Sequence, residues 1–79
     1  MTEDEVSKII VDAIAGSLGV APDEVRYERG EDLDSVSFIS VLVALDEAFD
    51  GKVATIEEIG NTFSAGGIID TLRKNELVD

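Results

Sequence analysis

Cysteine and histidine are both absent from the sequence, and each absence excludes a class of chemistry. Without cysteine, the chain has no disulfide and no thiolate metal site, which is typical of proteins from a reducing compartment. Without histidine, it has no imidazole base, no imidazole metal ligand and no Ser-His-Asp or Cys-His arrangement. We therefore expect a protein that is not an enzyme and has no dedicated metal site.

Basic residues and long apolar runs are also scarce. Six Lys and Arg face eighteen Asp and Glu, and the formal net charge is -12. This charge repels nucleic acid and anionic membranes, and it favours partner proteins with basic docking patches. The longest apolar run, residues 41–45, is far too short to cross a bilayer, and the acidic first residues lack the layout of a signal peptide. We expect a cytoplasmic protein without a membrane span.

The residues that are present suffice for one small folded domain. The chain has 79 residues, of which 44% are apolar, too many for a disordered acidic tail. A core of this size is marginal, because small domains bury a smaller fraction of their surface. No stretch has the length and pattern of a strand, so the prediction is a single all-α domain over residues 1–79, expected to be a monomer.

The first helix is predicted over residues 3–18. Thr2 and Glu5 have the spacing of a capping box, and Gly19 is placed to end the helix. We expect one face to pack on the core, because apolar residues recur on it at helical spacing: Val6, Ile9, Ile10, Ala13 and Ile14.

The second helix is predicted over residues 35–49, with Asp34 as its N-cap and Asp50-Gly51 as its end. Its expected core face contains Phe38, Ile39, Leu42, Leu45 and Phe49. The opposite face carries Val36, Ser37, Ser40, Val43, Ala44 and Glu47. Several of these are apolar where a solvent-facing helix is normally charged, and an exposed apolar strip with a polar rim is typical of a contact surface. The alternative is a central helix that is buried on nearly all sides.

A long loop connects these two helices. It contains one helical turn at Pro22 and a turn at Gly30. Three spaced apolar residues are expected to hold the loop on the core: Val25, Tyr27 and Leu33.

After the second helix, a short third helix is expected around Ile56, Ile59 and Phe63. Ser64 caps a last helix, in which Gly66 and Gly67 would let another helix approach closely. Its apolar residues repeat at helical spacing: Ala65, Ile68, Ile69 and Leu72. Together the elements predict a small four-helix bundle with a long first loop and a short third helix.

The segment GEDLDSVSFISVLVALDEAF, residues 30–49, resembles the phosphopantetheine-attachment segment of acyl carrier proteins. The family pattern is a loop ending in Leu-Asp-Ser and an aliphatic residue, followed by a helix that closes with ALxExF. The matching residues are Leu33, Asp34, Ser35, Val36, Ala44, Leu45, Glu47 and Phe49. The segment NTFSAGGIIDTL, residues 61–72, is similar to the family's last helix, so the resemblance covers essentially the whole chain.

The resemblance implies that a phosphopantetheinyl transferase moves 4′-phosphopantetheine from coenzyme A onto the Ser35 hydroxyl, with Asp34 aiding the transfer near the transferase's Mg²⁺. The thiol of that arm would carry acyl groups as thioesters to acyl-transferring or condensing enzymes of fatty acid, lipid or polyketide-type biosynthesis. The residues are consistent with this, because a phosphodiester on Ser35 would lie at a helix N-terminus, where free N–H groups favour an anion. A carrier needs no histidine or cysteine, since partner enzymes do the chemistry.

By the same resemblance, partner enzymes dock on the second helix, and the expected docking residues are Val36, Ser40, Val43 and Glu47. Carriers of bulk fatty acid synthesis usually have acidic residues early in this helix, whereas this chain has Ser37 and Ser40 there. Its acidic residues lie in the preceding loop and late in the helix: Glu28, Glu31, Asp32, Asp34, Asp46, Glu47 and Asp50. We therefore expect a specialised carrier whose dedicated partners dock through more apolar contact.

Two alternatives come from other classes of protein. The segment DEAFDGKVATIE, residues 46–57, partly fits a twelve-residue EF-hand calcium loop. Positions 1, 5, 6, 8 and 12 of that loop are held by Asp46, Asp50, Gly51, Val53 and Glu57, but position 3 is Ala48, which offers no ligand. The second alternative is an adaptor whose Ser35 is never modified, because Asp and Ser are also preferred helix caps.

Overall fold

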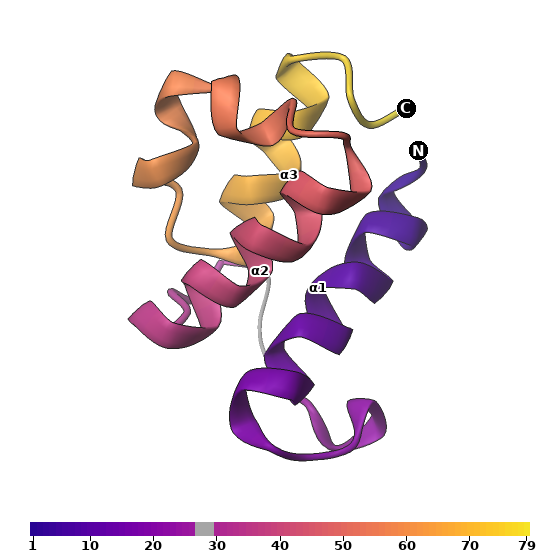
Figure 1. The fold of residues 1–79 in the computed structure, drawn as a ribbon, viewed down its shortest axis with the longest axis vertical. Helices are drawn as coiled ribbons and strands as arrows, with labels where there is room; N and C mark the ends of the chain where they lie inside the picture. The colour runs from indigo at the N-terminus through magenta and orange to yellow at the C-terminus, as the bar shows by residue number, and fades with distance from the viewer. Residues whose placement is uncertain (27–29) are drawn as a thin grey trace.

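The computed structural model describes residues 1–26 and 30–79, which form a small helical bundle. It contains α1 (Glu3–Leu18), η1 (Pro22–Glu24), α2 (Ser35–Ala48), η2 (Val53–Thr55), η3 (Glu57–Asn61) and α3 (Ala65–Lys74), where η denotes a short 3-10 helix. Figure 1 shows α1 alongside α2, with α3 behind α2 and the two chain ends close together. The ends are joined directly, since the amide of Asp79 donates to the carbonyl of Met1 at 3.0 Å.

The mostly helical fold confirms the all-α prediction but not the predicted four-helix bundle, because the described residues form three α-helices and the short third helix is not an α-helix. Its place is taken by η2 and η3, whose runs of three and five residues suit the tighter 3-10 geometry. Ile56 and Ile59 are buried as expected, whereas Phe63 is 47% exposed. Among the described residues, the pairing of β type is confined to an isolated bridge between Asp32 and Ser64.

The limits of α1 are those predicted. The Thr2 hydroxyl accepts from the amide of Glu5 at 3.2 Å, and the Glu5 carboxylate accepts from the amide of Thr2 at 3.0 Å. These reciprocal bonds satisfy two amides that the helix itself cannot bond. At the other end, Gly19 has a φ of 73°, the left-handed conformation that closes a helix and that glycine adopts without steric cost.

Side-chain caps also start the other two helices. Asp34 accepts from the amide of Ser37 at 2.8 Å, and Ser64 accepts from the amide of Gly67 at 3.0 Å. Both helices therefore begin at the residues that the sequence indicates, and residues 50–51 turn the chain after α2 with positive φ values.

The core lies where α1, α2 and α3 meet, and the segment containing η2 and η3 closes one side of it. One cluster contains the buried apolar side chains Val6, Ile10, Ile14, Phe38, Val41, Leu45, Val53, Ile56, Ile59, Ala65, Ile68, Ile69, Leu72 and Val78. Ile9 and Ala13 pack against it, so the predicted apolar faces of α1 and α3 are confirmed. Val25 and Leu33 hold the long loop on the core, while Tyr27 and Glu28 lie outside the described residues.

The predicted core face of α2 is wrong at two positions. Ile39, expected in the core, is 60% exposed, and Ser37, expected on the outer face, is only 2% exposed. The buried face instead follows Phe38, Val41 and Leu45, with Leu42 and Phe49 at its edge. Because α2 is apolar almost all round, its own pattern does not decide which side faces α1.

At Gly67, the close approach expected in α3 involves the helix's own cap rather than a second helix. A methyl group added at Gly67 would lie 2.9 Å from the carbonyl oxygen of Thr62 and 3.0 Å from the hydroxyl of Ser64. Gly16, exposed in the last turn of α1, has no atom within 4 Å of the same position.

This contrast predicts opposite effects for the same substitution. Gly16→Ala should raise the free energy of unfolding by about 0.5–1 kcal/mol, because alanine is the better helix former. Gly67→Ala should lower the free energy of unfolding by about 1–3 kcal/mol, although alanine is again the better helix former. The reason is that the new methyl group would lie too close to the atoms of the cap. Urea denaturation of both variants measures the two changes, and stabilisation by both substitutions would contradict the close approach.

The capping box of α1 predicts a pH dependence. The pKa of Glu5 lies below its ordinary value of 4.5, because the amide and then the hydroxyl of Thr2 donate hydrogen bonds to the carboxylate. A lowered folded-state pKa means that the unfolded state binds more protons, so this stabilisation is fully present above pH 4.5 and is lost as pH falls through the lowered pKa.

We therefore expect Glu5→Gln to unfold at a lower temperature than the parent chain near neutral pH, with the difference shrinking at acid pH. Glutamine keeps the capping-box geometry and removes only the charge. Melting curves of both proteins from neutral to acid pH measure this difference, and a constant difference across that range would show that the charge of Glu5 is not responsible.

Candidate functional site

The candidate site is the junction between the long loop and α2. Ser35 is the first residue of α2, and its side chain is exposed between the exposed residues Asp34 and Val36. Asp34 has φ -67° and ψ 163°, the extended conformation of an N-cap. The hydroxyl of Ser35 takes no part in the cap, because the bond to the Ser37 amide comes from Asp34. A reagent can reach Ser35 from solvent.

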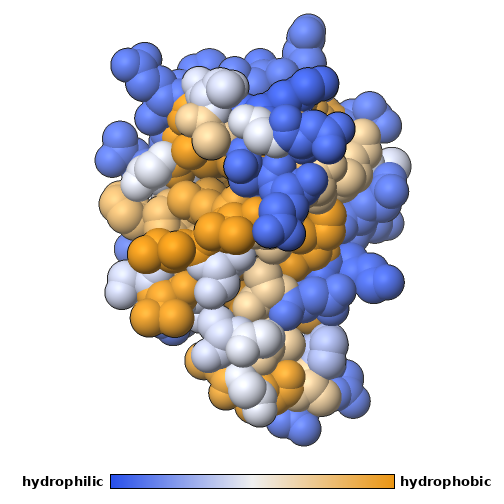
Figure 2. Space-filling view, in the orientation of Figure 1, coloured by the Kyte–Doolittle hydropathy of each residue, from blue (hydrophilic) through white to orange (hydrophobic). Residues whose placement is uncertain are grey.

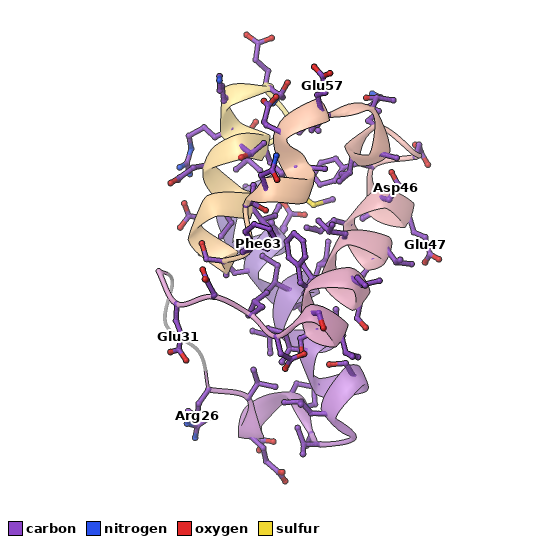
Figure 3. The ribbon with its side chains drawn as sticks, turned by 90° about the vertical axis from the view of Figure 1, so that its left-hand side faces the viewer. Arg26, Glu31, Asp46, Glu47, Glu57 and Phe63 are labelled. Carbon is purple, nitrogen blue, oxygen red and sulfur yellow. The ribbon has the colours of Figure 1, made fainter. Side chains whose placement is uncertain are left out.

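The loop before Ser35 is held by the start of α3. The amide of Leu33 donates to the carbonyl of Phe63 at 2.7 Å, and Asp32 forms the isolated bridge with Ser64. Phe63 adopts a φ of 53° in this arrangement, which is uncommon for a residue other than glycine. Its ring lies with its centroid 5.3 Å from that of Phe38 and remains half exposed beside α2 (Figure 3). Two helices therefore fix the backbone that presents Ser35.

A pair of serine hydroxyl groups lies beneath this junction, buried Ser37 and half-buried Ser17, and the sequence did not predict this contact. The Ser37 hydroxyl donates to Oδ2 of Asp34 at 3.2 Å and lies 3.0 Å from the hydroxyl of Ser17 on α1. The Ser17 hydroxyl is also 2.9 Å from the carbonyl oxygen of Ile14. A signal was present in the sequence, since Ser17 follows Ile14 by three residues on the buried face of α1 and Ser37 precedes Val41 by four on α2.

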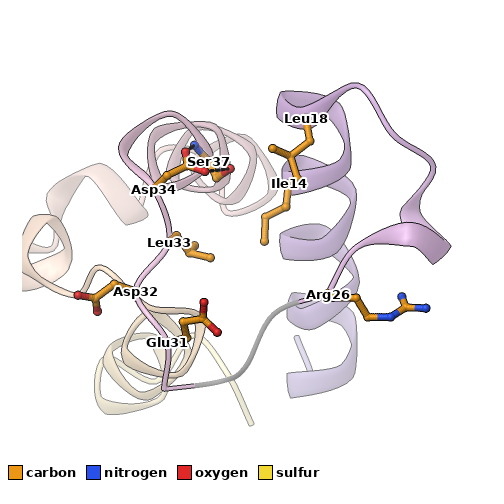
Figure 4. Close-up of a pocket in the computed structure, with 8 residues that line it drawn as sticks. All are labelled: Ile14, Leu18, Arg26, Glu31, Asp32, Leu33, Asp34 and Ser37. Carbon is orange, nitrogen blue, oxygen red and sulfur yellow. Dashed lines mark hydrogen bonds between the residues drawn. The ribbon is translucent and has the colours of Figure 1, made fainter.

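A small hollow of about 140 Å³ opens beside this network, between the end of α1 and the start of α2. It is lined by Ile14, Leu18, Arg26, Glu31, Asp32, Leu33, Asp34 and Ser37. Figure 4 shows Asp34 and Ser37 on one side of it and Arg26 pointing outward. The Arg26 guanidinium donates to the carbonyls of Asp23 and Val25 at 2.8 and 3.0 Å. Part of its hydrogen-bonding capacity is therefore used by the backbone of its own loop.

The outer face of α2 is an apolar strip, which we define by its exposed and half-exposed residues Val36, Ile39, Ser40, Val43 and Glu47. Val36, Ile39 and Val43 are 63%, 60% and 53% exposed. The structure thus brings all four predicted docking residues to one face and adds Ile39. Figure 2 shows apolar surface over α2, next to polar surface on the neighbouring elements. The α2 strip runs along the helix from its first turn, which contains Ser35.

A larger hollow of about 360 Å³ lies beside the α2 strip, between α2 and the segment containing η2 and η3. Its lining residues are Leu42, Val43, Asp46, Glu47, Val53, Ala54 and Ile59. Most of these are apolar, and the two carboxylates belong to the exposed end of α2, where Figure 3 labels them. The hollow can shelter an apolar group near the α2 strip.

The residues of the EF-hand alternative do not converge on one point. The carboxylate of Asp46 accepts from the amide of Ala54 at 2.9 Å and so serves the turn into η2. Glu57 is the first residue of η3, and Figure 3 shows its carboxylate pointing outward, away from Asp46. Within residues 1–26 and 30–79, no group of three or more acidic side chains is placed to hold a metal ion.

Comparisons with known proteins add no relative. No protein-family model, curated protein sequence or solved structure matches this chain. None of the helices in the described part of the chain combines the length and the apolar character needed to cross a bilayer.

Proposed function

We propose that this protein is an acyl carrier that holds 4′-phosphopantetheine on Ser35. The observation that supports this best is the exposed Ser35 at the first position of α2, directly after an Asp34 cap that leaves the serine hydroxyl unused. In this proposal the bundle is of the acyl-carrier-protein type, with η2 and η3 in the place of the family's short third helix. The motif residues around Ser35 carry the resemblance to the acyl carrier family. The exposure of the Ser35 side chain gives a modifying enzyme the access that it needs.

The residues around Ser35 fit a phosphodiester. The first-turn amides of Ser35 and Val36 have no protein acceptor among the described residues, so they can face an anion at the N-terminus of a 14-residue helix. Backbone N–H groups and the helix dipole at this end both favour negative charge. No basic side chain is needed to hold the phosphate, which is consistent with the scarcity of Lys and Arg in the chain.

The attachment reaction consumes coenzyme A and is catalysed by a separate phosphopantetheinyl transferase. The Ser35 oxygen would form a bond to the phosphorus that carries pantetheine, and the bond from that phosphorus to the rest of the diphosphate would break. Adenosine 3′,5′-bisphosphate leaves, and the Ser35 proton passes to a base of the transferase or to solvent. Asp34 directly precedes Ser35 in the sequence, and in this proposal its carboxylate aids the transfer near the transferase's Mg²⁺. When attached, the arm would supply a thiol on which acyl groups are carried as thioesters.

The surfaces next to Ser35 suit the partners of such a carrier. The α2 strip offers apolar contact to transferring or condensing enzymes, and its acidic rim suits partners with basic patches. The hollow of about 360 Å³ between α2 and η3 is the place where we expect an apolar acyl chain to rest. Ile39 and Phe63 do not occupy this space, since both are about half exposed at the surface.

Intact-mass spectrometry tests the attachment. The purified chain is incubated with coenzyme A, Mg²⁺ and a broad-specificity phosphopantetheinyl transferase. We expect one phosphopantetheinyl group per chain in the parent protein and in Ser7→Ala, a control that removes a hydroxyl from α1, and none in Ser35→Ala. A parent chain that stays unmodified would overturn the carrier, and calcium-dependent helix formation in that case would favour the EF-hand alternative over the adaptor.

The α2 strip predicts a ranking of two substitutions. Val43→Asp should lower kcat/KM of the transferase for this chain by about tenfold, because it places a charge in an apolar contact. Glu47→Lys should lower it by only about two- to threefold, since exposed ion pairs contribute little. Steady-state kinetics of both folded variants measure the ranking, and a larger loss for Glu47→Lys would mean that docking is governed by charge.

A further inference from the structure

The hydrogen bonds beneath Ser35 require more protons than the two serines possess. Three contacts lie within hydrogen-bond distance: Ser37 to Asp34 at 3.2 Å, Ser17 to Ser37 at 3.0 Å, and Ser17 to the carbonyl of Ile14 at 2.9 Å. Each serine hydroxyl carries one proton, so two protons serve three contacts. One of the three contacts therefore lacks a proton at any moment.

Two arrangements keep the serine pair bonded to each other. In the first, Ser37 donates to Oδ2 of Asp34 and Ser17 donates to Ser37. In the second, Ser37 donates to Ser17 and Ser17 donates to the carbonyl of Ile14. The first is favoured while Oδ2 is ionised and has no other partner, because a hydrogen bond to a carboxylate is the stronger one. The second is available as soon as another cation or donor binds Oδ2.

The two oxygens of Asp34 consequently have separate tasks. Oδ1 accepts from the amide of Ser37 at 2.8 Å and holds the start of α2. Oδ2 can be released to an incoming group without leaving the Ser37 hydroxyl unpaired, although that residue is only 2% exposed. Ser17 provides the alternative acceptor, and it belongs to α1, 20 residues earlier in the chain.

We propose that Ser17 and Ser37 are positioning residues for Asp34. When the transferase engages Oδ2 of Asp34, the Ser37 hydroxyl donates its hydrogen bond to Ser17 instead. This proposal rests on the proposed modification of Ser35. It goes beyond that function by assigning a part in the attachment reaction to two hydroxyl groups beneath Ser35, those of buried Ser37 and half-buried Ser17. In this view α1 supports the attachment site chemically as well as by packing.

Transferase kinetics on four variants test the first half of the proposal. Ser17→Ala keeps both bonds between Ser37 and Asp34 and removes the hydroxyl that serves as the alternative acceptor, so we expect kcat to fall about fivefold with KM unchanged. Ser37→Ala should lower kcat about tenfold, and Ser37→Thr, which restores a hydroxyl, should recover most of it. Ser7→Ala, the matched change on α1 outside the network, should behave as the parent chain. Equal kcat values for all folded variants would overturn the proposal.

Backbone amide exchange, followed by NMR without transferase or coenzyme A, tests the second half. We expect the amide of residue 37 to exchange at least threefold faster in Ser37→Ala, because Asp34 is then held through Oδ1 alone. In Ser17→Ala, the amide of residue 37 should exchange no faster than in the parent chain. This result would show that Ser17→Ala removes a hydrogen-bond partner of Ser37 without loosening the start of α2. Unchanged exchange in Ser37→Ala would show that Ser37 does not position Asp34.

The two measurements distinguish the two proposals. A parent chain that gains no phosphopantetheine contradicts the carrier function, and with it the part assigned to Ser17 in the reaction. Modification at the same rate in every variant contradicts only the inference about the serine pair and leaves the carrier function standing.

Discussion

The Asp34 carboxylate fixes the start of α2, and the rest of the site depends on it. One oxygen holds the Ser37 amide at 2.8 Å and the other receives the Ser37 hydroxyl at 3.2 Å. From the opposite direction, the Leu33 amide is bonded to the Phe63 carbonyl at 2.7 Å. The residues before Ser35 are therefore held by α2 and by the start of α3 at once. All of these bonds avoid the Ser35 hydroxyl, so the fold leaves that group accessible and uncommitted.

The charge and the apolar strip of this protein act over different distances. A net charge of -12 attracts basic partners from beyond contact distance and keeps copies of the chain apart. In the proposed function, contact would take place on Val36, Ile39 and Val43, whose exposed apolar surface contributes only when water is excluded. Electrostatic attraction would then govern encounter, while apolar contact would govern how long a partner stays.

Features that depend on local sequence were predictable, and features that depend on packing between helices were not. The caps at Thr2 and Asp34 could be identified because a capping residue acts on amides two or three positions away. The apolar faces of α1 and α3 could also be identified, because each helix has one apolar stripe. In α2 the stripe is too broad, so the sequence could not decide that Ile39 faces solvent. The contact between Ser17 and Ser37 joins two helices: helical spacing places each serine near buried residues of its own helix, but no local pattern pairs the two.

The left-handed backbone of Phe63 affects how firmly the attachment loop is held. A φ of 53° at a residue with a side chain costs roughly 1–2 kcal/mol, and here it is maintained while the Phe63 carbonyl accepts from Leu33. A partner protein that offered the Leu33 amide another acceptor would let Phe63 return to an ordinary conformation. Breaking the Leu33–Phe63 hydrogen bond would then cost less free energy than breaking a hydrogen bond of the same length between unstrained residues. The strained Phe63 thus offsets part of the stabilisation that this hydrogen bond gives to the loop before Ser35.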